Sequence, residues 1–416
     1  MRGIRGFGLT GLAAAVLLAA ASSASAAVTT AKIRYVAPTG GSEQTLFDHE
    51  GLQIIGGCGP GGDTSIALRG TLDNSMLFVN GQGGESIGAV GNPGFNSGSA
   101  VFMPAILGLD GTFDAGQILF SRPNGTHITI DWAMHEDALF PSANQCGFWG
   151  VATIAKPGGR NRGSRRRIDF RKDASRKGKT VLEAKGLKLK ASCKAGNLGV
   201  LARTKADHAV LHANSQGLTE HYAGDENLRT KERFRLIKRL GLTAGDALDS
   251  GQLIYATPRG AVVSVDWIAR TNGAYGTGAK GGRGIPGPPQ FDCAFVGTAR
   301  TLGKRAGDRA WFARRRPEGL PASARRGSAP IPLTPFFERP PFGLSGRCIR
   351  AEGTDRILRV SGGSAEAGAF VGAEQASAGD AVSGTSAASG FSAGALTFPD
   401  HAAGHMAFVA AGGAVL

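Results

Sequence analysis

Short runs of alternating apolar and polar residues, rather than helical periodicities, dominate the sequence of this 416-residue chain. The clearest example lies between Asp114 and His135, where two such runs flank the segment Pro123-Asn124-Gly125. A period of two places successive side chains on opposite faces of a strand, and a glycine-containing turn between two runs closes a hairpin. The pattern therefore predicts a β-hairpin over residues 114–135.

The same hairpin occurs a second time, 135 residues further along the chain. Asp249 to Arg270 aligns with Asp114 to His135 without a gap, and 7 of the 22 positions are identical. Most of the remaining positions exchange similar residues, such as Ile for Leu or Phe for Tyr. The sequence thus contains an internal duplication, and whatever fold the first copy adopts is expected twice.

Nine candidate strands separated by glycine-rich turns follow one another in the first copy. They are KIRYV, QTLF, LQIIGGC, SIALR, MLFVN, AVFMPAI, QILF, HITIDWAM and GFWGVATI. The chain has 65 glycines and few aromatic residues, a composition that favours short strands and turns over long helices. We predict an all-β fold with tandem disulfide-closed β-sandwich (jelly-roll-like) domains and a partial third copy.

The five cysteines repeat with the same offset as the hairpin. Cys58 and Cys193 are 135 residues apart, and Cys146 and Cys293 open the matching phrases CGFWG and CAFVG. The expected disulfides are therefore Cys58–Cys146 and Cys193–Cys293, each closing a loop worth about 4–5 kcal/mol in the chain-entropy model. Cys348 is left as a free thiol.

The N-terminus has the three parts of a secretory signal peptide. Arg2 and Arg5 precede an apolar run over residues 8–21, and small residues lead up to Ala26. This pattern predicts a protein that is cleaved after Ala26 and released outside the cell, an oxidising setting in which cysteines pair. No later stretch has the length and apolarity of a membrane span.

The duplication and the charge pattern divide the chain into segments. We expect a signal peptide at 1–26, copy 1 at 27–154, a basic linker at 155–178, copy 2 at 179–300, a basic Pro-rich linker at 301–341 and a degenerate partial copy 3 at 342–416. A Gly-X-Y run over 278–289 reads as a glycine-proline loop rather than a collagen stalk.

The third copy matches the start, the middle and the hairpin of the others. Its segment AGALTFPDHAAGHMAFVAAGG takes the place of the hairpin, with Ala410 and Ala411 where the Asp-Trp pair stands, and no closing cysteine follows. We therefore expect this copy to be poorly ordered and to associate through an open edge or through Cys348.

Positive charge is concentrated in the two predicted linkers. Residues 27–154 carry 4 basic and 11 acidic side chains, whereas residues 156–194 carry 15 basic and 3 acidic ones. The candidate polyanion-binding residues are Arg160, Arg162, Arg165, Arg166, Arg167, Arg171, Lys172, Arg314, Arg315 and Arg316. Two interpretations stay open: a site for anionic envelope polymers, or a solvated spacer between domains. Aromatic residues are too sparse to form a specific nucleic-acid site.

Asp131-Trp132 and Asp266-Trp267 are the polar and aromatic pairs that both copies share. A sugar site would use both members, but neighbours on a strand point to opposite faces, which favours a tryptophan in the core and an aspartate outside it.

Histidines are the candidate metal ligands in the sequence. His127 and His135 occur in copy 1 only, and His401 and His405 have a helical spacing in a segment expected to form a hairpin. The sequence lacks the motifs of metallopeptidases, serine hydrolases and nucleotide-binding loops. We expect no cofactor, no metal and no enzymatic activity.

The shared motifs are G-L-x5-C, G-Q-[IL]-[LI]-[FY], D-W and C-x-F-x-G. They resemble a repeated β-domain of exported proteins of high-GC Gram-positive bacteria, over residues 44–150 and 179–298 and in part over 343–409. The resemblance implies a secreted β-domain and no activity. We expect a secreted binding or structural protein; the alternatives are a carbohydrate-active envelope module or hydrolase, and an assembly subunit with jelly-roll heads.

Overall fold

The structure is a computed structural model, and it describes strands of all three copies together with some of the turns of the first two. The described residues are 28–83, 86–103, 113–135, 145–158, 164–172, 175–194, 196–215, 221–240, 248–259, 261–274, 291–302, 334–339, 342–350, 356–364, 370–376, 381–384, 394–398 and 403–409. Every described element is a β-strand, which confirms the all-β prediction. The predicted signal peptide and the Gly-X-Y run lie outside the described residues.

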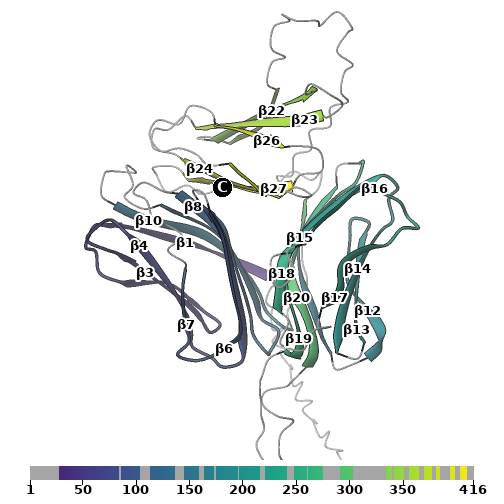
Figure 1. The fold of residues 1–416 in the computed structure, drawn as a ribbon, viewed down its shortest axis with the longest axis horizontal. Helices are drawn as coiled ribbons and strands as arrows, with labels where there is room; N and C mark the ends of the chain where they lie inside the picture. Colours follow the sequence, from purple (N-terminus) through teal and green to yellow (C-terminus); the bar gives the residue numbers. More distant parts are fainter. Residues whose placement is uncertain are drawn as a thin grey trace, which may run out of the picture.

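Copy 1 is a sandwich of two antiparallel sheets (Figure 1). Its strands are β1 (Val28–Pro38), β2 (Gln44–His49), β3 (Leu52–Cys58), β4 (Thr64–Gly70), β5 (Ser75–Gly83), β6 (Ser86–Phe95), β7 (Ala100–Phe102), β8 (Phe113–Ser121), β9 (His127–His135) and β10 (Gln145–Ala155). The six-stranded sheet has the order β1-β10-β9-β8-β5-β6, and the four-stranded sheet has the order β2-β3-β4-β7.

Copy 2 repeats this sandwich strand for strand. Its strands are β11 (Arg165–Lys172), β12 (Ser175–Ala184), β13 (Leu187–Lys194), β14 (Asn197–Thr204), β15 (Ala209–Ser215), β16 (His221–Leu228), β17 (Phe234–Leu240), β18 (Leu248–Ala256), β19 (Val262–Ala274) and β20 (Phe291–Leu302). The orders β11-β20-β19-β18-β15-β16 and β12-β13-β14-β17 match those of copy 1.

The predicted hairpins are confirmed as β8–β9 and β18–β19. Ile118 pairs with Ile130 in the first hairpin, which puts both side chains on the core face. The turn closes through a hydrogen bond from the Arg122 N–H to the Thr126 carbonyl, and Gly125 adopts a φ of 89° that favours glycine. Local turn chemistry and period-two alternation thus fix the register of this element.

Both predicted disulfides are present, and each joins the two sheets of its own sandwich. Cys58 at the end of β3 is bonded to Cys146 in β10, and Cys193 in β13 is bonded to Cys293 in β20. All four cysteines are buried in the cores, which lie between the sheets. The bridges therefore connect strands that are not neighbours in either sheet.

Copy 3 keeps the strand pairing of the other copies. Its described strands are β21 (Thr334–Arg339), β22 (Phe342–Arg350), β23 (Arg356–Ser364), β24 (Phe370–Ala376), β25 (Ala381–Gly384), β26 (Gly394–Phe398) and β27 (Ala403–Val409). The β21–β22 pair has a register shift between Pro335 and Phe337, at the position of the shift between Thr45 and Phe47 in copy 1. This shared register makes Cys348 the equivalent of Cys58.

The third hairpin, however, was wrongly predicted. β26 pairs with β23 in the four-stranded sheet β21-β22-β23-β26, whereas β27 pairs with β24 in the sheet β25-β24-β27. These pairings make β26 the counterpart of β7 and β27 the counterpart of β8. The segment is rich in glycine and alanine, so its side-chain pattern specifies register only weakly.

Two other predicted boundaries differ from the structure. The basic linker at 155–178 contains β11, which pairs with β20 as β1 pairs with β10, so the second sandwich begins at Arg165. Likewise β21 lies inside the predicted second linker and belongs to copy 3. The strand β6 was also missed, because its sequence SIGAVGNPGF has four glycine or proline positions that interrupt any alternation.

Candidate functional site

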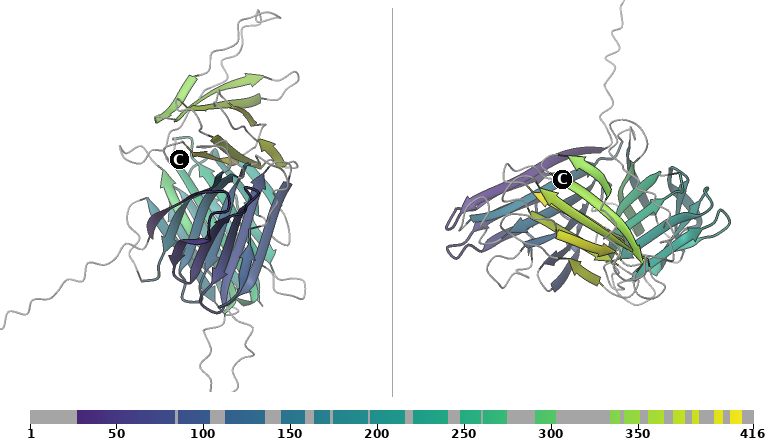
Figure 2. Two further views of the ribbon diagram at one scale, coloured as in Figure 1. Left: turned by 90° about the vertical axis from the view of Figure 1, so that its left-hand side faces the viewer. Right: turned by 90° about the horizontal axis from the view of Figure 1, so that it is seen from above.

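The six-stranded sheets of the first two copies pack face to face. Seen from above in Figure 2, the two sandwiches lie side by side, and in Figure 1 the four-stranded sheets face outward on either side. Equivalent strands meet at this junction, namely β1 with β11 and β10 with β20. Other contacts join non-equivalent strands, namely β9 with β20, β6 with β18 and β8 with β19, so the junction departs from two-fold symmetry.

An apolar cluster fills one part of this junction. Met76, Phe78 and Leu119 of copy 1 pack against four residues of copy 2, all of them at most 8% exposed. The copy 2 members are Leu248, Ile268, Ala294 and Val296. Because these side chains sit on the outward faces of the sheets, each sandwich alone would leave them in water, and docking buries them.

The shared Asp-Trp pairs divide between core and junction. Trp132 stacks on Phe148 with ring centroids 6.1 Å apart, and Trp267 packs on Phe295 at 5.6 Å, inside the respective cores. The neighbouring aspartates point to the other face of the sheet, so the interpretation of the tryptophans as core residues is confirmed.

At the junction the two aspartates meet two glutamines that the sequence analysis overlooked. Gln117 Nε2 donates to Asp131 Oδ1 at 2.9 Å and to Asp266 Oδ1 of the other copy at 3.3 Å. Gln252 Nε2 donates to Asp266 Oδ1 at 2.9 Å. Both glutamines belong to the repeated G-Q motif, and that shared identity was the available signal. The set is a polar contact between the copies, and the duplicated residues serve docking.

A second polar contact links β11 to the β8–β9 turn. Arg171 donates from Nε to Asp169 Oδ1 at 2.7 Å and from Nη1 to the Pro123 carbonyl, and Arg167 Nη1 donates to the Gly125 carbonyl at 3.2 Å. Gly125 lies so close that an added Cβ would come within 2.5 Å of the Arg171 guanidinium. These two arginines therefore hold the sandwiches together.

The electrostatics of Asp169 follow from this arrangement. Burial raises the pKa of Asp169, but the hydrogen bond from Arg171 and the charges of Arg171 and Arg167 outweigh it and hold this pKa below its usual range. The carboxylate thus remains ionised and neutralises part of the arginine charge. The donors of Arg167 and Arg171 in these contacts face protein acceptors, and the binding of a polyanion by these two residues stays a prediction.

The remaining predicted basic residues have different surroundings. Arg166 donates to the Glu183 carbonyl at 2.6 Å, and burial followed by repulsion from Arg300 lowers the pKa of Arg165. Lys172 is exposed at the end of β11. Arg160, Arg162, Arg314, Arg315 and Arg316 lie outside the described residues.

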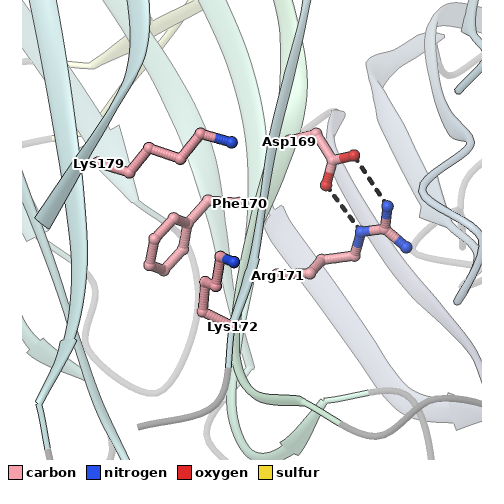
Figure 3. A pocket seen from close by; sticks show the side chains of 5 residues that line it. All are labelled: Asp169, Phe170, Arg171, Lys172 and Lys179. Atoms are coloured by element: carbon pink, nitrogen blue, oxygen red, sulfur yellow. Dashed lines mark hydrogen bonds and ion pairs between the residues drawn. The ribbon is translucent and has the colours of Figure 1, made fainter. Parts of the chain in front are cut away.

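A small recess opens beside β11, with a volume of about 200 Å³ (Figure 3). Its lining residues are Asp169, Phe170, Arg171, Lys172 and Lys179. Figure 3 shows Lys172 and Lys179 on either side of the Phe170 ring, whereas the paired Asp169 and Arg171 lie across the strand. The recess is therefore cationic on its open side, with two lysines available to an anion.

The histidines do not form a metal site in the part of the chain that the structure describes. His127 is buried, its Nε2 lies 3.0 Å from the Thr129 hydroxyl, and burial lowers its pKa to about 3. Among the described residues no group of three or more His, Cys, Asp or Glu side chains comes together. His135 and His405 lie in β9 and β27, and His401 lies outside the described residues.

Comparisons with protein families, with curated proteins and with solved structures found no match. Within the described residues there is no helix with the length and apolarity needed to cross a bilayer.

Proposed function

We propose that the protein is an exported, non-enzymatic binding or structural protein, in which a docked pair of β-sandwiches contacts anionic polymers of the cell envelope. The observation that carries this proposal is the cationic recess, where Lys172 and Lys179 flank Phe170 while Asp169, the carboxylate among the described lining residues, is neutralised by arginines. Long-range attraction between such a surface and a polyanion raises the rate of encounter and the affinity.

The charge distribution along the chain supports the same function. The first sandwich is acidic, and the excess of basic residues begins shortly before the strand that opens the second. An acidic partner sandwich would repel a polyanion, so binding is expected on the second sandwich alone. The disulfides agree with export, because such bridges form and persist in oxidising compartments.

We propose no catalytic role because of where the polar residues that copies 1 and 2 share are located. The Asp-Trp pairs serve the cores and the junction, and Asp131 and Asp266 are held by glutamine amides between two docked sheets. A protein of this kind acts by presenting surfaces on a rigid body. The proposal therefore assigns the function to exposed faces rather than to a reaction centre.

Retention on immobilised heparin tests the proposal. The wild-type protein should be retained at low ionic strength and should elute as salt is raised, because screening weakens contacts between exposed charges. The double variant Lys172→Gln/Lys179→Gln should elute at lower salt. The matched control Lys32→Gln/Arg34→Gln removes the same charge from the first sandwich and should elute like the wild type. Absence of retention at low salt would refute the proposal.

A further inference from the structure

The outward face of the four-stranded sheet in copy 2 carries a row of cations. In β13 the side chains of Leu187, Leu189, Ala191 and Cys193 are buried in the core. The alternate positions therefore point away from the core, and they include Lys188, Lys190 and Lys194. Successive outward residues of a strand lie along one line about 6.7 Å apart, and Ser192 is the uncharged outward residue between Lys190 and Lys194.

Neighbouring strands extend this charge sideways. Arg203 of β14 lies directly opposite Lys188. Lys190 pairs with Leu201 of β14, and Leu201 pairs in turn with Arg235 of β17, so these three residues lie in one row across the sheet. Arg203, Arg235 and Lys190 are exposed, and Lys188 is half-buried. Three adjacent strands thus present cations on the same surface.

This arrangement is costly for the fold. Like charges directly opposite on neighbouring strands are destabilising. Glu183 lies opposite Lys188 and is attracted to it, but the ion pair of Glu183 is with Lys205. Among the described residues, no carboxylate forms an ion pair with Lys190, Arg203 or Arg235. Stability does not account for this surface, and the surplus charge is available to an external anion.

The duplication supplies an internal comparison. By strand register, the positions of Lys188, Lys190, Arg203 and Arg235 correspond in copy 1 to Gln53, Ile55, Arg69 and Phe102. The same fold therefore tolerates a nearly uncharged face, on which Phe102 is 65% exposed. Since the sandwich does not require cations here, their presence in copy 2 is a specific property of that copy.

The cationic face and the recess beside β11 both reach β12. The aliphatic part of Lys190 lies over Gly178, where an added Cβ would come within 2.6 Å of the lysine Cε. Lys179 follows directly and lines the recess. Lys179 pairs with Ala191, which faces the core, whereas Thr180 pairs with the outward Lys190. The recess and the cationic face therefore lie on opposite sides of β12 and are separate surfaces.

We propose that the cationic face, defined by Lys188, Lys190, Arg203 and Arg235, binds a linear phosphate-bearing polymer laid across the strands. The inference rests on the proposed polyanion-binding function and names a further surface for it, with the ligand chemistry. Arginine forms bidentate hydrogen bonds with phosphate, and lysine binds phosphate as a point charge. The outward side chains of β13 and β14 include no aromatic ring, so the face offers charge and no platform for a sugar ring or a base.

Inorganic polyphosphate is the probe for this surface. Affinity is measured across a salt series for the wild type, a face variant and an off-face variant, all as the full chain. The face variant is Lys188→Gln/Lys190→Gln/Arg203→Gln/Arg235→Gln, and the off-face variant is Lys32→Gln/Arg34→Gln/Arg69→Gln/Arg259→Gln. Each variant loses four charges, so net charge is matched. Polygalacturonate, a carboxylate polymer, is tested in parallel.

The face variant should lose most of the affinity for polyphosphate. Its slope of log affinity against log salt should fall by about 3, since each contact of a flexible chain contributes about 0.7. The off-face variant should keep the wild-type slope, and polygalacturonate should bind more weakly than polyphosphate. A melting temperature equal to or above that of the wild type establishes that the face variant is folded, because all four side chains point away from the core and their mutual repulsion is removed.

Three results would overturn the inference. Equal weakening of both variants would show that net charge alone matters, and equal binding of polygalacturonate would refute the phosphate assignment. In both cases retention on heparin would leave the broader polyanion function intact. A wild-type protein that binds neither heparin nor polyphosphate would refute both proposals together.

Discussion

Replacement of Met76 by aspartate tests whether the two six-stranded sheets dock as the structure has them. Met76 is fully buried in the junction between the copies, and its equivalent by strand register, Val210, is 47% exposed. The duplication therefore provides one position in two environments. The same substitution at Val210 is the matched control.

The magnitude follows from what the junction buries. Burial of a methionine side chain contributes about 1.5–3 kcal/mol, and an unpaired buried carboxylate adds about 2–3 kcal/mol even when its pKa shifts to favour the neutral acid. Met76→Asp should therefore cost about 3.5–6 kcal/mol of docking free energy. Val210→Asp should change stability by less than about 0.5 kcal/mol, as exposed substitutions usually do.

Small-angle scattering and thermal unfolding provide the readout. Each sandwich has its own core and its own disulfide, so loss of docking should separate the two bodies before either unfolds. The radius of gyration of Met76→Asp should rise and its thermal transition should broaden or split. If Met76→Asp and Val210→Asp gave the same scattering and melting curves, the docking argument would be wrong.

Three further predictions concern buried groups and can be checked by unfolding measurements. Cys193→Ala should destabilise the second sandwich by about 2–5 kcal/mol and leave the melting of the first unchanged; equal loss in both would contradict independent cores. Burial raises the pKa of Asp249 to about 7, so stability should fall as pH rises from about 4 to 7, and Asp249→Asn should remove that slope. The lowered pKa of His127, about 3, means that stability falls as pH drops from about 6.5 to 3, and His127→Val, the residue of copy 2, should flatten that limb.

The elements that the sequence predicted correctly are those specified by local chemistry or by the duplication itself. The β8–β9 hairpin has alternation on both sides and a glycine turn, and the disulfides follow from cysteines repeated at one offset. The all-β class follows from the same short runs. In each case the information lies within a few residues or in a comparison of the two copies.

What the sequence did not predict depends on tertiary contacts. The sequence of the segment RRRIDFRK indicates a solvated linker, because only Ile168 and Phe170 show alternation. Its arginine Arg171 donates hydrogen bonds to Asp169 and to a carbonyl group of the other sandwich, and the sequence alone does not show these partners. The sequence does not predict the docking of the six-stranded sheets, for a related reason. An apolar side chain on the outward face of a sheet, such as Leu119, cannot be told from a core residue by the sequence pattern.

The two copies together separate residues that the fold needs from residues that one copy uses. Cysteines, tryptophans and the Gln-Asp pairs recur in both, and they close the cores or join the copies. The outward face of the four-stranded sheet differs instead, cationic in copy 2 and nearly uncharged in copy 1.

Because docking buries one face of each sandwich, the four-stranded sheets remain the faces on which the copies are free to diverge (Figure 1). Because the six-stranded sheet of each copy is packed against the other copy, only the four-stranded sheets can carry different surface residues in the two copies. The cationic row through Lys188 and Lys190 lies on that sheet, where a change in charge leaves both the core and the junction intact. This separation of roles is why we place binding on the second four-stranded sheet and structural function on the first two six-stranded ones.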